Sequence, residues 1–243
     1  LLCRSHCILT GVPGLAKTLL IKTLAEASEL QFTRVQFTPD MMPADIIGSQ
    51  IIEELPDGRR RFEFVKGPVF TQLLLADEIN RTPPKTQSAL LEAMEEQQVS
   101  ADGKVYPLPE PFFVLATQNP IEQEGTYQLP EAQQERFMFS LRIDYPDFDS
   151  ELRVMCETTG SAQQKPEKAI TAAELIAFQN AIRCIPVPES VAKFAVRLVR
   201  ASRPGAPEKL EFVEKYVKWG AGPRACQYLA LAGKALAALD GRF

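Results

Sequence analysis

The octapeptide GVPGLAKT, residues 11–18, limits most strongly how this chain can fold. It follows a short apolar run, His6–Thr10, and precedes a run of good helix formers, Thr18–Leu30. These residue types predict a strand, a glycine-containing loop and a helix, in that order. Such a loop presents backbone N–H groups at a helix N-terminus, where the dipole favours anions. The segment is therefore a candidate phosphate site.

The loop nearly matches the pattern G-x-x-x-x-G-K-[ST], and its residues have expected roles. Gly11 and Gly14 let the backbone bend and approach a ligand closely. Lys17 would reach the β- and γ-phosphates of a nucleotide, and the Thr18 hydroxyl would ligate Mg²⁺. Ala16 stands where the pattern has glycine; we expect helical φ and ψ angles there, which suit alanine. A glycine turn before an ordinary helix is the alternative. The expected nucleotide-binding residues of the loop are Gly11, Val12, Pro13, Gly14, Leu15, Ala16, Lys17 and Thr18.

A second feature, the stretch QLLLADE at residues 72–78, favours a working nucleotide site. Its continuous apolar run fits a strand that is covered on both faces. Asp77 and Glu78 then lie at the carboxyl end of that strand, where ligand crevices of open α/β sheets lie. Asp77 would hold Mg²⁺ through its water shell, and Glu78 would polarise the attacking water. We expect Glu78 and Lys17 to be catalytic; a solvated turn is the alternative for an isolated Asp-Glu pair.

Strand and helix signals alternate through the first part of the chain, which predicts an α/β fold with a parallel sheet flanked by helices. Asp57-Gly58 and Asp102-Gly103 predict the turns of two hairpins. We expect Thr82 to cap a helix that runs to about Glu96. Further strands are expected at 32–37, 112–117 and 139–143, and a short helix at 130–137.

After Tyr145-Pro146 the strand signals stop and helical signals take over. One apolar helical face contains Val191, Phe194 and Leu198, and Pro223 opens another helix. We therefore expect a nucleotide-binding core over residues 1–146 and a smaller all-α domain over residues 147–243. The chain begins almost at the glycine loop and stops after a helix, so we expect both domains to be truncated parts of a longer protein.

Composition and charge exclude several functional classes. The 243 residues have a formal net charge of −4, which argues against a general nucleic-acid binder. The sequence has no apolar run long enough to span a membrane. Its five cysteines form no Cys-x-x-Cys pair, so we expect reduced thiols in a cytoplasmic protein rather than a zinc site. A metal corner at Cys3, His6 and Cys7 would lack a fourth ligand.

Five strings, in this order along nearly the whole chain, resemble the MoxR family of AAA+ ATPases. They are GVPGLAKT, LLLADEINRTPPKTQSALLEAMEE, VLATQNP, LPEAQQERF and GPRA. Members of the family have either alanine or glycine before the lysine. The resemblance implies a P-loop NTPase core of the AAA+ type with a small C-terminal all-α lid, and it implies ATP and Mg²⁺ as cofactors.

The same resemblance assigns three further residues. Asn119 resembles sensor 1, whose amide holds the water or the γ-phosphate. Arg136 resembles the arginine finger, which acts catalytically on a neighbouring subunit's nucleotide. Arg224 resembles sensor 2, a lid arginine that contacts nucleotide in its own subunit. A strand-end turn residue and a surface arginine are the alternatives for Asn119 and Arg136. The family more often has EAQLDRF and SPRA, so Gln134, Glu135 and Gly222 depart from it, and Gly222 is a weaker helix cap than serine.

The resemblance also implies a homo-oligomeric ring, expected to be a hexamer, that remodels or activates a partner protein. That partner would bear a von Willebrand factor A domain; no nucleic-acid partner and no membrane span are expected. The two hairpins resemble family insertions that project towards a pore or partner. Arg59, Arg60 and Arg61 near one turn could bind an acidic partner or form a solvated turn. A magnesium-chelatase-like or nucleic-acid-linked AAA+ subunit, and a nucleotide switch without turnover, stay as alternatives.

Overall fold

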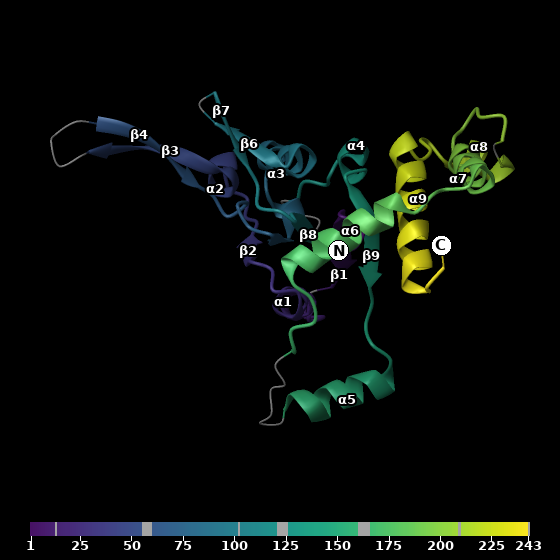
Figure 1. Cartoon of the computed structure of the whole chain (residues 1–243), viewed down its shortest axis with the longest axis horizontal. Coiled ribbons are helices and arrows are strands. Elements are labelled where there is room, and N and C mark those ends of the chain that lie inside the picture. The colour runs from purple at the N-terminus through teal and green to yellow at the C-terminus, as the bar shows by residue number, and fades with distance from the viewer. Residues whose placement is uncertain are drawn as a thin grey trace. The chain divides into compact units, whose positions relative to one another are not determined.

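The computed structural model describes residues 1–12, 14–54, 60–101, 103–120, 126–159, 166–208 and 210–242 (Figure 1). Contacts between residues divide the chain into two compact units. The α/β unit comprises residues 6–130 and 139–172, and the helical unit comprises residues 1–5, 131–138 and 173–243. These units interleave along the chain. The expected division into consecutive domains after residue 146 therefore stays a prediction.

Five strands form the central sheet, in the order β2-β5-β8-β1-β9. Strand β2 pairs with β5, β5 with β8 and β8 with β1, each pair in parallel register. Every residue of β5 is buried, as the apolar run requires. The predicted α/β fold with a parallel sheet is thereby confirmed. The strands are β1 (His6–Gly11), β2 (Phe32–Gln36), β5 (Leu73–Asp77), β8 (Phe113–Gln118) and β9 (Phe137–Ile143).

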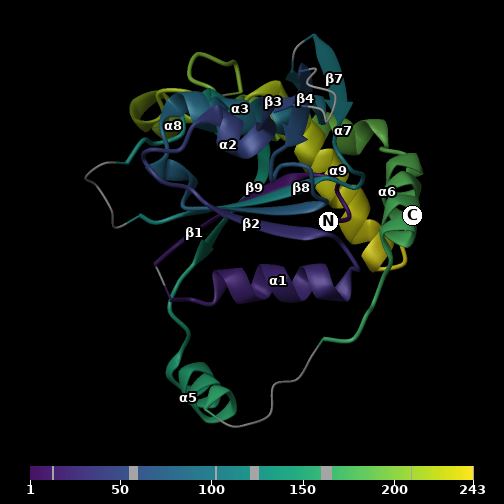
Figure 2. The same ribbon diagram turned by 90° about the vertical axis from the view of Figure 1, so that its left-hand side faces the viewer.

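Helices cover both faces of this sheet. Figure 2 shows α1 (Lys17–Ala27) on one side, and α2 (Pro43–Ile47) and α3 (Pro84–Glu96) on the other. A 3₁₀ turn, η1 (Ile79–Arg81), leads from β5 towards α3. The expectation that Thr82 caps α3 is wrong. Pro83 is the N-cap residue and makes no side-chain cap bond, whereas Thr82 is fully buried.

Both predicted hairpins are present. One consists of β3 (Gly48–Glu54) and β4 (Arg60–Lys66), the other of β6 (Gln98–Ala101) and β7 (Lys104–Pro107). They lie side by side, because the rings of Phe64 and Tyr106 stack with 4.4 Å between their centroids. Residues 55–59, with Arg59 and the expected Asp57-Gly58 turn, lie outside the described residues, as does Asp102.

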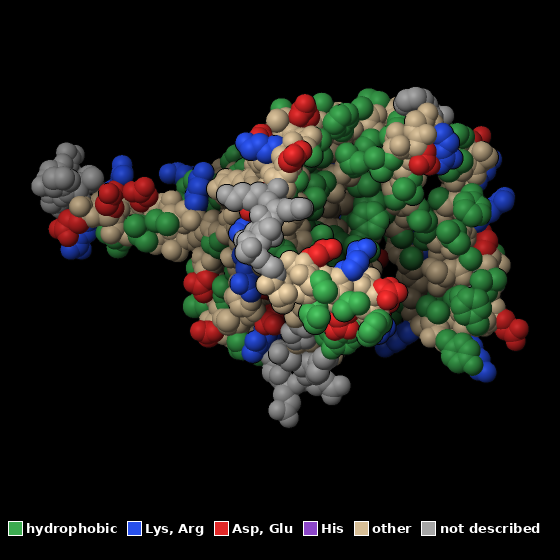
Figure 3. All heavy atoms as spheres, turned by 90° about the horizontal axis from the view of Figure 1, so that it is seen from below, with side chains coloured by type: hydrophobic (Ala, Val, Ile, Leu, Met, Phe, Trp, Pro, Cys, Tyr) green, Lys and Arg blue, Asp and Glu red, His purple; other side chains and the backbone are tan. Residues whose placement is uncertain are grey.

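Acidic and basic side chains occur together on the β3–β4 hairpin (Figure 3). The guanidinium of Arg61 donates to Glu53 at 2.7 Å and to Glu63 at 3.1 Å. These hydrogen bonds raise the pKa of Arg61 and lower that of Glu53. Part of the basic charge of the arginine run is therefore paired within the hairpin itself.

The helical unit contains α4 (Glu131–Gln134), most of α6 (Ala172–Cys184), α7 (Glu189–Ala201), α8 (Glu211–Tyr216) and α9 (Pro223–Leu239). Cys3 packs against Ile182 of α6 and Ala235 of α9 in its core. The amide of Gln179 donates to the carbonyl of Leu1 at 3.0 Å. The first residues of the chain are thereby held among the helices.

The remaining helix, α5 (Phe148–Thr158), has no buried residue. Asp147 caps it by accepting a hydrogen bond from the backbone N–H of Ser150 at 2.8 Å. None of the helices that the structure describes is both long and apolar enough to cross a membrane.

Candidate nucleotide-binding site

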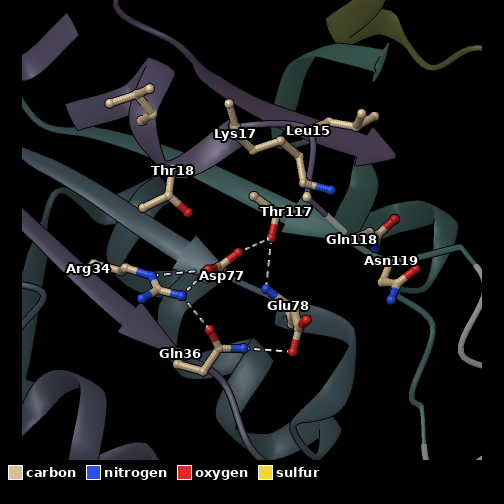
Figure 4. A pocket seen from close by; sticks show the side chains of 13 residues that line it. Leu15, Lys17, Thr18, Arg34, Gln36, Asp77, Glu78, Thr117, Gln118 and Asn119 are labelled. Atoms are coloured by element: carbon tan, nitrogen blue, oxygen red, sulfur yellow. Dashed lines mark hydrogen bonds and ion pairs between the residues drawn. The ribbon is translucent and has the colours of Figure 1, made fainter. Parts of the chain in front are cut away.

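A cavity of about 450 Å³ lies at the carboxyl ends of β2, β5 and β8, beside the start of α1 (Figure 4). The α/β unit supplies all of its lining, so three motifs that are far apart in sequence meet there. Gly11 and Val12 precede the lining part of the glycine loop, and Pro13 lies outside the described residues. The lining residues are Gly14, Leu15, Ala16, Lys17, Thr18, Leu19, Arg34, Gln36, Asp77, Glu78, Thr117, Gln118 and Asn119.

The glycine loop depends on close backbone packing. A Cβ atom at Gly11 would lie 2.5 Å from the carbonyl oxygen of Ile143, so only glycine fits there without rearrangement. Gly14 has a φ of +85°, which L side chains rarely adopt. The ammonium of Lys17 donates to the carbonyl oxygens of Gly11 and Val12, the latter at 3.0 Å. The lysine charge thus lies on the loop, where a phosphate group would compete for it.

The expectation of helical φ and ψ angles at Ala16 is wrong. Ala16 is not helical: it is the N-cap residue of α1, with φ 52° and ψ 23° in the left-handed region. Alanine is disfavoured in that region by about 1–2 kcal/mol, because its Cβ approaches the following carbonyl oxygen. Glycine would avoid this strain. The helix begins at Lys17, one residue later than a helical Ala16 would require.

Asp77 ends β5 with its carboxylate held from two sides. The Thr117 hydroxyl donates to Oδ1 at 2.6 Å. Nε and Nη2 of Arg34 both donate to Oδ2, at 3.1 and 2.7 Å. Asp77 is only 9% exposed, so this ion pair is largely shielded from water on the carboxylate side.

Glu78 follows with a left-handed backbone, at φ 57°. Its Oε2 accepts hydrogen bonds from Gln36 Nε2 at 2.6 Å and from Arg81 Nη1 at 3.0 Å. Its backbone N–H donates to the Thr117 hydroxyl at 2.8 Å. Thr117 therefore connects the two acidic residues, because its hydroxyl donates to Asp77 and accepts from the backbone N–H of Glu78. A strained backbone at a pocket-lining acid is typical of functional sites.

Asn119 follows β8 and is 7% exposed. Figure 4 shows it with Gln118 on the side of the pocket that faces Glu78. Its backbone carbonyl oxygen lies 3.5 Å from Nδ2 of Asn80, which belongs to η1. The segments that follow β5 and β8 are thereby joined at the edge of the pocket.

Gln87 is a supporting residue that the sequence did not single out. It is fully buried, and its Nε2 lies 3.1, 3.1 and 2.9 Å from the carbonyl oxygens of Ile79, Thr82 and Tyr127. This amide fastens the turn after Glu78 to the segment that follows Asn119. Its place on α3 gave no sequence signal, because a polar residue in an amphipathic helix normally faces solvent.

Arg34, Gln36 and Thr117 were also missed. A weak signal existed, since Arg34 and Gln36 alternate along β2 and so lie on one face of the strand. Nothing in the sequence tells which residues of β5 that face meets.

The other two expected functional residues, Arg136 and Arg224, belong to the helical unit. Arg136 follows α4, and the Tyr228 hydroxyl lies 3.1 and 3.5 Å from the carbonyl oxygens of Glu135 and Arg136. Arg224 is the second residue of α9. A Cβ at Gly222 would come within 2.2 Å of Glu135 Oε1. Gly222 and Glu135 are therefore neighbours in space.

Comparisons with known proteins agree with this geometry. The family model described as "ATPase family associated with various cellular activities (AAA)" matches residues 6–139. The chain is 43% identical over 244 residues to Chaperone MoxR1 of Mycobacterium tuberculosis, and it covers 63% of that protein's length. It is 41% identical to the uncharacterized protein YeaC of Bacillus subtilis, of which it covers 72%, and 30% identical to Protein MoxR of Paracoccus denitrificans, of which it covers 74%. In these three alignments 100%, 100% and 99% of the present chain are matched.

A solved structure supports the same assignment. The putative ATPase from Cytophaga hutchinsonii superposes with a TM-score of 0.88 and 44% identity, over 99% of this chain and 73% of its own. The chain thus matches these four proteins over 99–100% of its own length, and spans between 63% and 74% of theirs. It belongs to the MoxR family of AAA+ ATPases.

Proposed function

We propose that this chain binds ATP in the described pocket and hydrolyses it with the help of Mg²⁺. The observation that carries the proposal is the meeting of Lys17, Asp77 and Glu78 around one cavity. Loop N–H groups and Lys17 would bind the β- and γ-phosphates. A water molecule in the pocket would attack the γ-phosphate. Glu78 would accept the proton of this water, and the Asn119 amide would orient the water.

The residues present fit a magnesium ion. Thr18 and Asp77 both line the pocket and offer a hydroxyl and a carboxylate, the hard oxygen ligands that Mg²⁺ prefers. Asp77 already holds a cation, the guanidinium of Arg34, which shows that a positive charge is stable at this carboxylate. Bound Mg²⁺ would supply neutralisation of the phosphate charge.

Two arginines of the helical unit complete the proposal. Arg136 would act as an arginine finger on the nucleotide of a neighbouring subunit, and Arg224 would contact the nucleotide of its own subunit. Hydrolysis would then need a ring, for which we infer six subunits from the family. The proposed role is to remodel or activate a partner protein, one with a von Willebrand factor A domain, in the cytoplasm. Chaperone MoxR1 supports this role by its name.

Steady-state ATPase activity measured against protein concentration tests the proposal. We expect specific activity to rise with concentration, and both Glu78→Gln and Arg136→Ala to reduce it by at least about a hundredfold, as losing a catalytic base or an arginine finger does. Arg200→Ala is the matched control, because Arg200 forms an ion pair with Glu208 and lies outside the proposed machinery. It should keep wild-type activity.

The same assay separates the alternatives. ATP binding without phosphate release at any protein concentration would favour a nucleotide switch. Strong stimulation by DNA or RNA would favour a nucleic-acid-linked subunit, whereas stimulation by a von Willebrand factor A domain would support the proposed partner.

A further inference from the structure

Arg34 places a positive charge on the carboxylate to which the proposed function assigns Mg²⁺. Its Nε and Nη2 both reach Asp77 Oδ2, at 3.1 and 2.7 Å (Figure 4). A carboxylate oxygen has two lone pairs, so these two bonds fill the capacity of Oδ2. Thr117 occupies one direction of Oδ1. A metal ion at Asp77, or a water of its shell, would have one acceptor direction left, on Oδ1, and the ion would lie beside the guanidinium charge.

The burial of Asp77 makes the two cations alternatives. Its side chain is 12% exposed, whereas that of Arg34 is 47% exposed. A buried carboxylate without a positive partner is strongly unfavourable. The other basic residue of the described pocket lining, Lys17, donates to loop carbonyls. Arg34 is therefore the charge that compensates Asp77, and its own exposure leaves it room to move away.

Gln36 connects the same guanidinium to the proposed catalytic base. Arg34 Nη2 donates to Gln36 Oε1 at 2.9 Å, and Gln36 Nε2 donates to Glu78 Oε2 at 2.6 Å. One amide thus connects Arg34 to Glu78.

We propose that Arg34 is the resident counter-cation of Asp77, which Mg²⁺ must displace when nucleotide binds. The exchange lowers the affinity for the metal. This proposal rests on the proposed function, because it presumes that magnesium nucleotide occupies the pocket.

Equilibrium binding of a fluorescent, non-hydrolysable ATP analogue (mant-AMPPNP) tests the exchange without measuring turnover. The dissociation constant is measured with Mg²⁺ and with EDTA, and the ratio of the two shows how much the metal strengthens binding. In Arg34→Gln the metal meets no competing cation, and without the metal the bare Asp77 carboxylate repels the phosphates. The ratio should rise about tenfold over wild type, the lower end of what a hydrogen bond to a charged group contributes. The ratio for Arg34→Lys should lie between the ratios for wild type and for Arg34→Gln.

Arg200→Gln is the control, since it removes an arginine–glutamate pair at 3.0 Å outside the pocket. It should leave the ratio unchanged. A ratio for Arg34→Gln within twofold of wild type, or below it, would overturn the competition. Absence of analogue binding by the wild-type chain in both buffers would instead refute the proposed nucleotide site.

The exchange can also be tested on the wild-type chain, so the result does not depend on whether a pocket variant folds. In ¹H–¹⁵N NMR spectra of the analogue-bound chain, the Nε–H signal of Arg34 should shift when Mg²⁺ replaces EDTA. An Arg34 signal that stays in place would mean that Arg34 keeps Asp77, and this would refute the exchange.

Discussion

At the residue scale, Ala16 has a backbone conformation that its place in the phosphate-loop motif did not predict. It holds a left-handed conformation with φ 52° at the start of α1, where glycine is favoured. Replacing Ala16 by Gly removes about 1–2 kcal/mol of strain and gives back roughly 0.5–1 kcal/mol through the freer unfolded chain. We expect Ala16→Gly to raise the free energy of unfolding by about 0.5–1 kcal/mol, measured by urea denaturation.

Ala177→Gly is the control, because the same substitution should there lower the free energy of unfolding. Ala177 is exposed within α6, where glycine costs about 1 kcal/mol relative to alanine. Destabilisation of similar size in both variants would show that Ala16 is not strained.

The wrong expectation of helical angles at Ala16 has a simple physical cause. A sequence pattern locates a helix start to within a residue or two, whereas the backbone angles differ completely between the cap and the first helical turn. Lys17, Asp77 and Glu78 could be located because each lies at or just after the carboxyl end of a strand, and these ends of parallel strands share one edge of the sheet. Arg34 could not be assigned to Asp77, since 43 residues separate them and only the strand register brings them together.

At the scale of elements, His6 joins two neighbouring strands of the sheet to a helix. From β1, its Nδ1 accepts the backbone N–H of Val114 in β8 at 2.9 Å, and its Nε2 lies 3.4 Å from the carbonyl of Met94 in α3. Its ring meets Phe112 edge-on. Burial lowers the pKa of His6 to about 4. The structure thus uses this histidine as a neutral core residue, and not as part of the metal corner considered for Cys3 and Cys7.

This buried histidine predicts a loss of stability in mild acid. The unfolded chain takes up a proton near pH 6.5, whereas the folded chain resists until about pH 4. Stability should therefore fall as the pH decreases through this window, by about 3 kcal/mol in total. Urea denaturation from pH 7.5 to 4.5 measures the slope. His6→Gln cannot titrate, and because the chain has one histidine, most of the slope above pH 5 should disappear. An unchanged slope would assign it to other groups.

Elements were predictable to different degrees for physical reasons. The buried strands were predictable, because an apolar run such as that of β5 fits few other structures. The hairpins followed from Asp-Gly turns. Helix caps were less predictable: a threonine before two prolines resembles a cap, but Thr82 is buried in the core instead.

At the scale of the whole molecule, the proposed site is incomplete within one chain, because Arg136 would serve a neighbour. A Glu78→Gln chain keeps its arginine finger, and an Arg136→Ala chain keeps its base. In a mixed ring, the pocket of an Arg136→Ala subunit that adjoins a Glu78→Gln subunit has both groups. Random mixing in equal amounts creates such a site at about a quarter of positions, that is one half times one half.

We therefore expect two nearly inactive variants to recover about a quarter of wild-type ATPase activity when they are mixed, provided that subunits exchange. The double variant Glu78→Gln/Arg136→Ala, mixed with wild type, is the control: it can only dilute activity. Labelled subunits followed by energy transfer verify that exchange has occurred. If exchange is complete and the mixture stays inactive, then Arg136 acts within its own subunit or not at all. The neighbour would then contribute nothing to hydrolysis through this residue, and the case for a ring would rest on the family alone.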